Sequence, residues 1–169
     1  AFNEKGVDPR FGIYLAMIES EHCLCLQSPT GPLGMFQFTT ERGELLGLKV
    51  KYGATAANPD ERCEPEPSAL AAASYMKLLM VRYGEGPASI PLAIGTYNTG
   101  INESLYQALS SNSGLPQEFW TVFADNENLS KQFQSENLRY VPKFFAAAIV
   151  GEYPEDFGLN LRPLSSYTN

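Results

Sequence analysis

The sequence predicts an all-α protein. Apolar residues recur at the three- and four-residue spacing of helices, helix caps flank those runs, and no alternating strand pattern of useful length occurs. The chain has 169 residues, of which 44% are hydrophobic and 18% charged. A globular chain of this size buries a sizeable core without a covalent or metal staple. We therefore expect one domain over residues 1–169, without internal repeats.

The first predicted helix has Asp8 as its N-cap and begins at Pro9. Aspartate is a favoured N-cap, and proline is favoured at the first helical position. Four apolar residues then recur on one face: Phe11, Tyr14, Leu15 and Ile18. We expect this amphipathic helix to end between Ser20 and Cys25, because loop-forming Ser, Pro and Gly residues fill positions 27–34.

Further helices are expected along the rest of the chain. A short helix is expected over 35–46, followed by an irregular connection over 49–67. Ser68 is expected to cap a helix over 69–83 that is rich in strong helix formers and stops at Gly84. The remaining expected helices are 91–98, closed by Gly100, short pieces over 103–109 and 116–123, and a last long helix over 136–150. Its apolar positions are Leu138, Val141, Phe144, Phe145, Ala148 and Ile149. We expect Pro142 near its first turn, where proline is tolerated.

The charge balance limits the classes of partner. Twelve Lys and Arg residues against 19 Asp and Glu residues give a formal charge of −7, which argues against nucleic acid because phosphate binding needs a basic face. No apolar run reaches the roughly 20 residues that a membrane helix needs. The first residues lack the basic and apolar regions of a signal peptide. We expect a mature or excised soluble domain, with any signal or anchor outside it.

Three cysteines, Cys23, Cys25 and Cys63, fit neither a complete disulfide set nor a four-ligand zinc site. Two interpretations remain open. The thiols are buried or free, or Cys63 forms a disulfide with either Cys23 or Cys25. A bond between Cys23 and Cys25 is disfavoured because their proximity in the chain strains disulfide geometry.

Few residues are suited to catalysis. His22 is the only histidine, and without a Gly-x-Ser-x-Gly elbow or a paired-histidine metal spacing neither a serine hydrolase nor a metal site is predicted. No phosphate loop or dinucleotide fingerprint occurs, so we expect no cofactor. Glu19 ends the apolar first helix, and an apolar setting favours the protonated carboxyl that a general acid requires. Helical periodicity does not distinguish Glu19 from Glu21.

Three segments follow one another in a recognisable order. Glu19-Ser20 precedes Ser28-Pro-Thr-Gly-Pro-Leu-Gly-Met-Phe-Gln37, and Thr96-Tyr-Asn-Thr-Gly100 comes later. These segments resemble the signature of the lytic transglycosylase domain, glycoside hydrolase family 23. Two more segments resemble the branch of membrane-bound lytic transglycosylase D: Asp60-Glu-Arg62 and Glu136-Asn-Leu-Arg-Tyr140-Val-Pro-Lys-Phe144. The resemblance covers nearly the whole chain.

The resemblance implies a lysozyme-like helical fold with a substrate groove and a single catalytic residue, Glu19. Glu19 is expected to act as acid and then as base in cleaving the MurNAc-β-1,4-GlcNAc bond of peptidoglycan, which leaves 1,6-anhydro-MurNAc ends. The residues implied to contact substrate are Ser28, Met35, Gln37, Tyr97, Asn98, Glu136 and Tyr140. The implied partner is the peptidoglycan glycan strand. The protein is expected to be a monomer in the periplasm or another extracytoplasmic compartment.

Two alternatives remain open. A goose-type lysozyme shares the fold but hydrolyses the bond with help from an additional aspartate, for which Asp60 and Asp125 are the candidates. A glycan-binding module without activity is the second alternative, and the acidic charge is compatible with it. Departures from the family pattern at Thr30, Pro32 and Phe36 leave the catalytic positions intact and bear on the glycan subsites.

Overall fold

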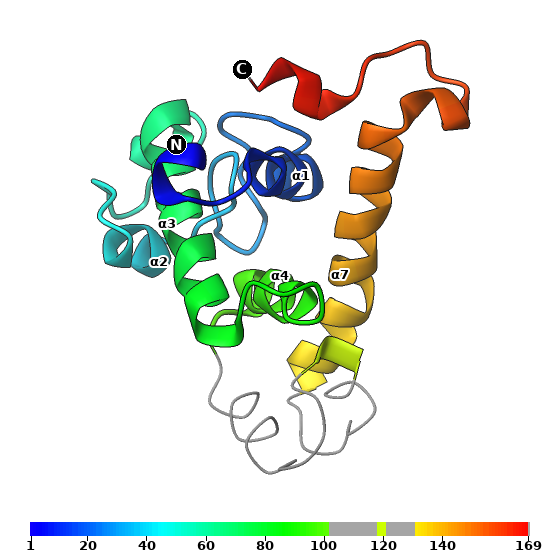
Figure 1. Cartoon of the computed structure of the whole chain (residues 1–169). Helices are drawn as coiled ribbons and strands as arrows, with labels where there is room; N and C mark the ends of the chain where they lie inside the picture. Colours follow the sequence, from blue (N-terminus) through cyan, green and yellow to red (C-terminus); the bar gives the residue numbers. More distant parts are fainter. Residues whose placement is uncertain (102–117, 121–130, 169) are drawn as a thin grey trace. The chain divides into compact units, whose positions relative to one another are not determined.

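The computed structural model describes residues 1–101, 118–120 and 131–168, and these residues form an all-α fold (Figure 1). In chain order the elements, with η for a 3-10 helix, are η1 (Asn3–Lys5), α1 (Pro9–Ser20), α2 (Thr40–Leu45), η2 (Glu61–Cys63), α3 (Pro65–Tyr83), α4 (Ile90–Thr99), α7 (Lys131–Glu152), η4 (Pro154–Phe157) and η5 (Leu164–Tyr167). Among the described residues the extended backbone pairs are isolated bridges, such as that between Leu33 and Phe38. The predicted fold class is confirmed.

The chain divides into two compact units. Unit 1 comprises residues 1–75 and 146–169, and unit 2 comprises residues 76–145. Buried apolar side chains in unit 1 include Phe2, Val7, Tyr14, Leu15, Ile18, Leu33, Phe36, Phe38, Leu48 and Tyr75. Those in unit 2 include Met76, Leu79, Met80, Leu92, Ile94, Tyr97, Phe119, Val141 and Phe144. The expectation of a single domain stays a prediction.

Helix α1 forms as its sequence predicts. The Asp8 carboxylate accepts a hydrogen bond from the backbone N–H of Arg10 (2.9 Å), and Pro9 occupies the first helical position. The helix ends at Ser20 because Glu21 adopts a left-handed backbone conformation (φ 54°). Its N–H then bonds to the Met17 carbonyl (3.1 Å), which closes the last turn.

Helix α2 is shorter than predicted. Residues 34–37 form a turn, and the helix begins only at Thr40, where the Thr39 hydroxyl caps it by accepting the Arg42 N–H (3.1 Å). The expected start at residue 35 was wrong because the backbone there is engaged elsewhere. The Leu33 N–H donates to the Phe38 carbonyl (3.0 Å), which a continuous helix through this segment would prevent.

Helix α3 starts earlier than predicted. It begins at Pro65, so Ser68 lies inside the first turn and is not its N-cap; the Ser68 hydroxyl donates to the Pro65 carbonyl (3.3 Å). Proline suits this first position because its missing N–H would have no helical partner there. The expected irregular connection over 49–67 therefore ends with η2 and the start of α3. The predicted stop at Gly84 is confirmed.

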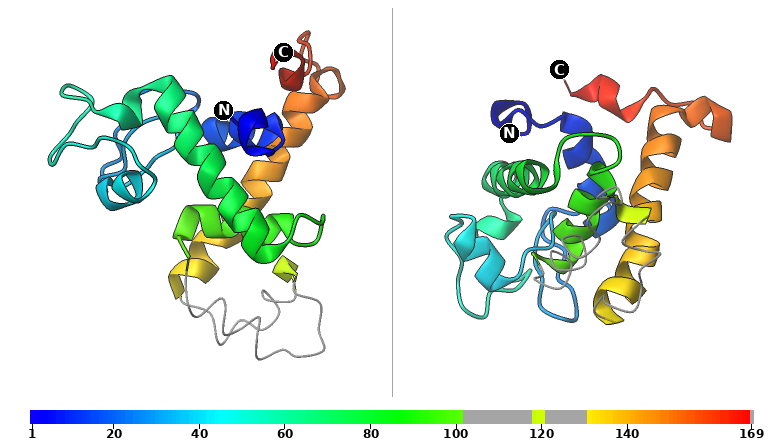
Figure 2. Two further views of the ribbon diagram at one scale, coloured as in Figure 1. Left: turned by 60° about the vertical axis from the view of Figure 1, so that its left-hand side comes forward. Right: turned by 60° about the horizontal axis from the view of Figure 1, so that its bottom comes forward.

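Helices α4 and α7 lie side by side within unit 2, where α7 contributes its N-terminal half (Figure 2). Helix α4 matches its prediction, with one further residue at each end. Helix α7 begins at Lys131, five residues earlier than predicted, so Pro142 lies in its interior and not near its first turn. Val141 and Phe144 are buried, whereas Leu138 and Ile149 are exposed, so the predicted apolar face was too wide. The helix expected over 103–109 lies outside the described residues; of that expected over 116–123, Phe119 and Trp120 are described and helical.

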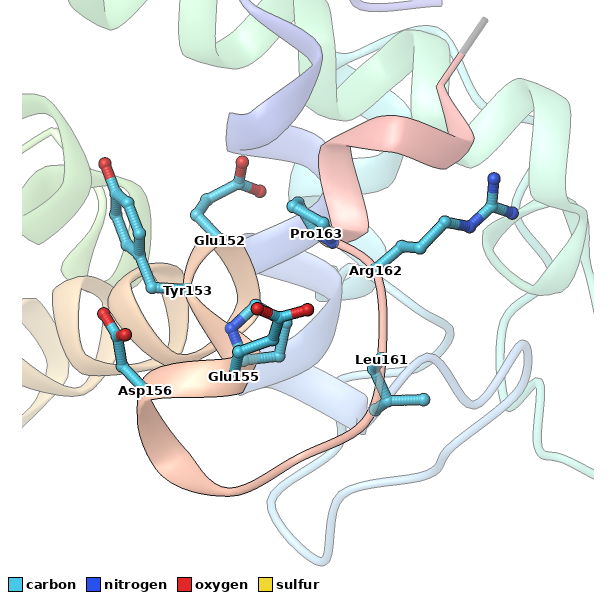
Figure 3. Close-up of a pocket in the computed structure, with 8 residues that line it drawn as sticks. Glu152, Tyr153, Glu155, Asp156, Leu161, Arg162 and Pro163 are labelled. Carbon is cyan, nitrogen blue, oxygen red and sulfur yellow. The ribbon is translucent and has the colours of Figure 1, made fainter.

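The C-terminal segment completes unit 1. Glu152, at the end of α7, accepts hydrogen bonds from the Tyr14 hydroxyl and from the N–H (3.2 Å) and hydroxyl (2.6 Å) of Ser165. Burial raises the pKa of Glu152, but these hydrogen bonds outweigh it and hold that pKa below its usual value. Glu152, Arg162 and Pro163 are among the residues that line a cavity of about 290 Å³, and the Arg162 side chain extends away from Glu152 (Figure 3). This cluster fixes η5 against α1 (Figure 1).

None of the described helices combines the length and the apolar character that a membrane span requires.

Candidate active site

Glu19 is the penultimate residue of α1 and is half-buried. Glu21, which periodicity left as an equal candidate, is exposed and lies outside the helix in a left-handed conformation. The two carboxylates therefore differ in setting, and Glu19 alone has the partly desolvated environment that suits a general acid. His22 is also left-handed (φ 61°), and burial lowers the pKa of its imidazole.

Ser20 connects the Glu19 end of α1 to the loop that follows. Its side chain is buried, and its hydroxyl lies 2.8 Å from the Met35 carbonyl oxygen and 3.2 Å from that of Ala16. The first contact fixes a residue fifteen positions away beside the helix end. The Glu-Ser pair therefore places a loop next to Glu19, and sequence reasoning had given Ser20 no such task.

Residues 26–38, termed here the 26–38 loop, are held by their own backbone. The Gly34 N–H donates to the Leu26 carbonyl (2.9 Å), and the Ser28 N–H donates to that of Pro32 (2.9 Å). The Ser28 hydroxyl accepts the Thr30 N–H (3.3 Å) and lies 3.0 Å from the Thr30 hydroxyl. Ser28 thus shapes the tip of the loop, where the residue is half-buried.

Gln37 holds the base of the same loop. Its side-chain Nε2 donates to the carbonyls of Leu26 (2.9 Å) and Gly34 (2.7 Å), and its backbone is left-handed (φ 51°). Its amide oxygen accepts no hydrogen bond from the part of the chain that the structure describes. Gln37 therefore has an acceptor for a ligand, whereas its donors already serve the protein.

Met35 lies in the loop between the two polar candidates. It lines a cavity of about 440 Å³ together with Phe2, Gly12, His22 and other residues of unit 1. Most of this lining is apolar, and the cavity is lined by the α1 residues Pro9, Gly12, Ile13 and Ala16. Met35 is therefore half-buried against the helix, and its carbonyl is the group that Ser20 binds.

A buried ion pair lies against the loop. The Arg62 side chain is 1% exposed and that of Asp60 is fully buried, with Nη2 and Oδ2 2.9 Å apart. Arg62 Nη1 also donates to the Phe38 carbonyl (3.2 Å). Burial raises the pKa of Asp60, but hydrogen bonds from Arg62 and from the Lys51 N–H outweigh it and lower that pKa. Asp60 is therefore a counter-ion and does not have a free oxygen to activate water.

Gly34 lies against the backbone of Arg62. Its φ of +90° is strained for any side chain, and a Cβ built on it would lie 1.9 Å from the Arg62 carbonyl oxygen. Only glycine fits here.

A disulfide joins Cys25, the residue immediately before the 26–38 loop, to Cys63, the residue immediately after Arg62. Of the pairings that the sequence left open, this one forms, and Cys23 is an exposed free thiol.

The other candidates belong to unit 2. Tyr97 lies in α4 with 7% of its surface exposed, and Tyr140 is half-buried in α7. The Asn98 amide donates to Glu136 (3.4 Å), which links the two helices. Gly95 lets them approach closely, since a Cβ there would lie 3.3 Å from the Asn137 side chain.

The described residues thus bring the candidates together in two sets. Ser28, Met35 and Gln37 share the 26–38 loop, which Ser20 ties to the Glu19 end of α1. The α4 and α7 candidates form the second set, in unit 2. Sequence reasoning missed Ser20, Gly34 and Arg62 as organisers of the first set, although all three stand within the segments that resemble the family.

The all-α fold and a helix-end glutamate beside a glycine-containing polar loop define the lysozyme-like class of helical domains. A family model for the transglycosylase SLT domain matches residues 1–118. The chain belongs to this family, and it is therefore a lytic transglycosylase domain in the general sense, with peptidoglycan as its class of substrate. No curated protein matches the sequence. The family match contains Glu19, the 26–38 loop and Tyr97, and it ends before Glu136 and Tyr140.

Proposed function

We propose that the chain cleaves the MurNAc-β-1,4-GlcNAc bond of peptidoglycan without water and leaves 1,6-anhydro-MurNAc ends. The observation that carries the proposal is the Ser20–Met35 hydrogen bond, which ties a polar loop to the end of the helix where Glu19 lies half-buried. Family membership supports the reaction class. The proposal adds the identity of the catalytic carboxyl and of the product.

In the first step Glu19, as the protonated acid, gives its proton to the glycosidic oxygen while the bond from that oxygen to the MurNAc anomeric carbon breaks. The GlcNAc 4-hydroxyl leaves, and the carbonyl oxygen of the MurNAc acetamide bonds to the anomeric carbon as an oxazolinium. In the second step the Glu19 carboxylate takes the proton of the MurNAc 6-hydroxyl. The oxygen of that 6-hydroxyl attacks the anomeric carbon and displaces the acetamide oxygen. Glu19 is then protonated again.

Ser28 and Gln37 are proposed to bind the sugars from the 26–38 loop. The Gln37 amide oxygen suits a hydroxyl or acetamide N–H donor, since its Nε2 is already bound to Leu26 and Gly34. We assign to Tyr97 and Tyr140 the hydroxyl contacts that orient the acetamide. Met35, Asn98 and Glu136 complete the proposed substrate contacts. We also propose that the chain belongs to the branch of membrane-bound lytic transglycosylase D and that it is a monomer.

The proposed compartment is extracytoplasmic, and periplasmic in a cell with an outer membrane. Peptidoglycan lies outside the cytoplasm, and disulfides such as Cys25–Cys63 form and persist in oxidising compartments. The acidic net charge of −7 leaves glycan binding to short-range hydrogen bonds and packing.

The goose-type hydrolytic alternative loses one of its two candidate aspartates. Both Asp60 oxygens accept hydrogen bonds from Arg62, and one also accepts the Lys51 N–H. A carboxylate so occupied is a poor base for water. The other candidate, Asp125, lies outside the described residues.

The test is mass spectrometry of purified peptidoglycan after digestion, with Glu19→Gln and Glu21→Gln as matched variants. We expect anhydro products from the wild type and from Glu21→Gln, and a rate at least about 100-fold lower for Glu19→Gln, since general acid–base catalysis contributes about that much or more. Products heavier by one water in place of the anhydro species would establish hydrolysis. An inert wild type that binds glycan would favour the binding module, and an active Glu19→Gln would refute the catalytic assignment.

A further inference from the structure

Two consecutive residues, Arg62 and Cys63, fix the 26–38 loop at three places. Cys63 is bonded to Cys25, the residue immediately before the loop. The Arg62 carbonyl lies against Gly34 in its middle, and Arg62 Nη1 donates to the Phe38 carbonyl at its end (3.2 Å). One short element, η2, therefore determines where the loop starts, passes and ends.

Arg62 is an unusual residue to bury for packing alone. A buried ion pair gains little or nothing over apolar side chains of similar volume, because removing both charges from water is unfavourable. Arg62 is nevertheless 1% exposed and paired with a fully buried Asp60, which the Lys51 N–H orients (2.9 Å). What the guanidinium adds, and an apolar side chain lacks, is a donor for the Phe38 carbonyl and the Thr40 hydroxyl (3.4 Å).

The polar groups proposed to bind glycan depend on this support. Gln37 directly precedes Phe38, whose carbonyl accepts a hydrogen bond from the Arg62 guanidinium, and it bonds to the carbonyl of Gly34, which lies against the Arg62 backbone carbonyl. A shift at either of these two residues moves the Gln37 amide. Small displacements matter because binding groups must be held within about 0.5 Å of their working geometry.

We infer that Arg62 is a positioning residue for glycan binding: its guanidinium holds the Phe38 carbonyl and thereby sets the Gln37 amide for the sugar without touching the sugar itself. This inference rests on the proposed function. It predicts that Arg62 controls affinity for the glycan in the folded protein, beyond any effect on how much protein is folded.

The experiment measures binding of a GlcNAc-MurNAc tetrasaccharide by calorimetry, in a Glu19→Gln background so that the sugar is not consumed. The key variant combines Asp60→Asn with Arg62→Met, so that both charges of the ion pair are removed at once and neither is left buried without its partner. The Asn side chain can still accept the Lys51 N–H. We expect its Kd to rise about tenfold or more. Arg62→Lys keeps a charge for Asp60 but loses the forked donor geometry, and we expect a smaller rise.

The matched control is Glu152→Gln, which weakens a hydrogen-bonded carboxylate cluster of the same unit that binds Tyr14 and Ser165 and not the loop. It should lower the melting temperature and leave the Kd within twofold of its parent. A folded Asp60→Asn/Arg62→Met protein with unchanged Kd overturns the inference. If that variant does not fold, the same comparison is made with Arg62→Lys, and an unchanged Kd for folded Arg62→Lys overturns the inference. Failure of the parent to bind the sugar, with no cleavage by the wild type, would instead refute the proposed function.

Discussion

In unit 1 the side-chain donors around the 26–38 loop have acceptors, whereas in unit 2 a buried amide has no hydrogen-bond partner among the described residues. Gln37 donates twice to loop carbonyls, and Arg62 donates to Phe38 and Asp60. Asn137 in α7 is fully buried beside Gly95, and neither of its side-chain polar atoms has a hydrogen-bond partner among the residues described.

The difference indicates two ways in which the two units hold their candidate residues in place. The loop lacks regular secondary structure, so its shape must come from specific hydrogen bonds, an ion pair and a disulfide. Helices α4 and α7 satisfy most of their backbone groups internally, so their contact depends on close packing more than on polar contacts such as Asn98–Glu136. A buried polar side chain without a hydrogen-bond partner among the described residues is tolerated there at a cost of about 1–3 kcal/mol. The loop should therefore be sensitive to loss of polar contacts, and the helix pair should not.

The largest expected effect concerns the disulfide. Replacing Cys25 and Cys63 together by Ser should lower the free energy of unfolding by about 4 kcal/mol, because the bond closes a loop with a sequence separation of 38 residues. Urea denaturation measures this change. Cys23→Ser, at the exposed free thiol, is the control and should behave as wild type. Equal stability of the double variant and wild type would mean that the cross-link does not support unit 1.

The next effect compares glycines in the two units. Gly34→Ala should destabilise by about 2–4 kcal/mol, because its Cβ would overlap the Arg62 carbonyl and its φ is left-handed. Gly95→Ala should change stability by about 1 kcal/mol or less, since the gain in helix propensity offsets a contact of 3.3 Å. Gly31→Ala, with a φ of +112° and open space around it, isolates the conformational part. A Gly34→Ala protein no less stable than Gly31→Ala would contradict the close contact.

The smallest effect tests the unpaired amide. Asn137→Leu should leave the free energy of unfolding unchanged or raise it by about 1 kcal/mol, because it removes buried polar atoms that have no hydrogen-bond partner among the described residues. Gln37→Met should lower it by about 1 kcal/mol, because the Leu26 and Gly34 carbonyls lose a donor. Thermal melts of both variants measure the difference. A clear loss of stability in Asn137→Leu would show that this amide has a partner in solution.

Features set by neighbouring residues could be predicted from the sequence, whereas features set by contacts between distant residues could not. Helix α1 was predicted with its cap because Asp8 and Pro9 act on their immediate neighbours. The start of α2 was misplaced because residues 35–38 are shaped by Ser20 and by pairing with Leu33, and such contacts leave no periodic signal. The task of Arg62 likewise depends on a carbonyl 24 residues away. The resemblance to the family, and not helical spacing, singled out Glu19.

The anchoring of η5 has a practical consequence for cutting the chain. The family match ends at residue 118, yet the unit that contains Glu19 is completed by residues 146–169. A fragment trimmed to the matched region would deprive the Tyr14 hydroxyl of its acceptor Glu152 and would uncover the part of α1 on which η5 packs. The boundary recognised by sequence is therefore not a boundary at which the polypeptide can be divided, and expression of the domain has to include its C-terminal segment.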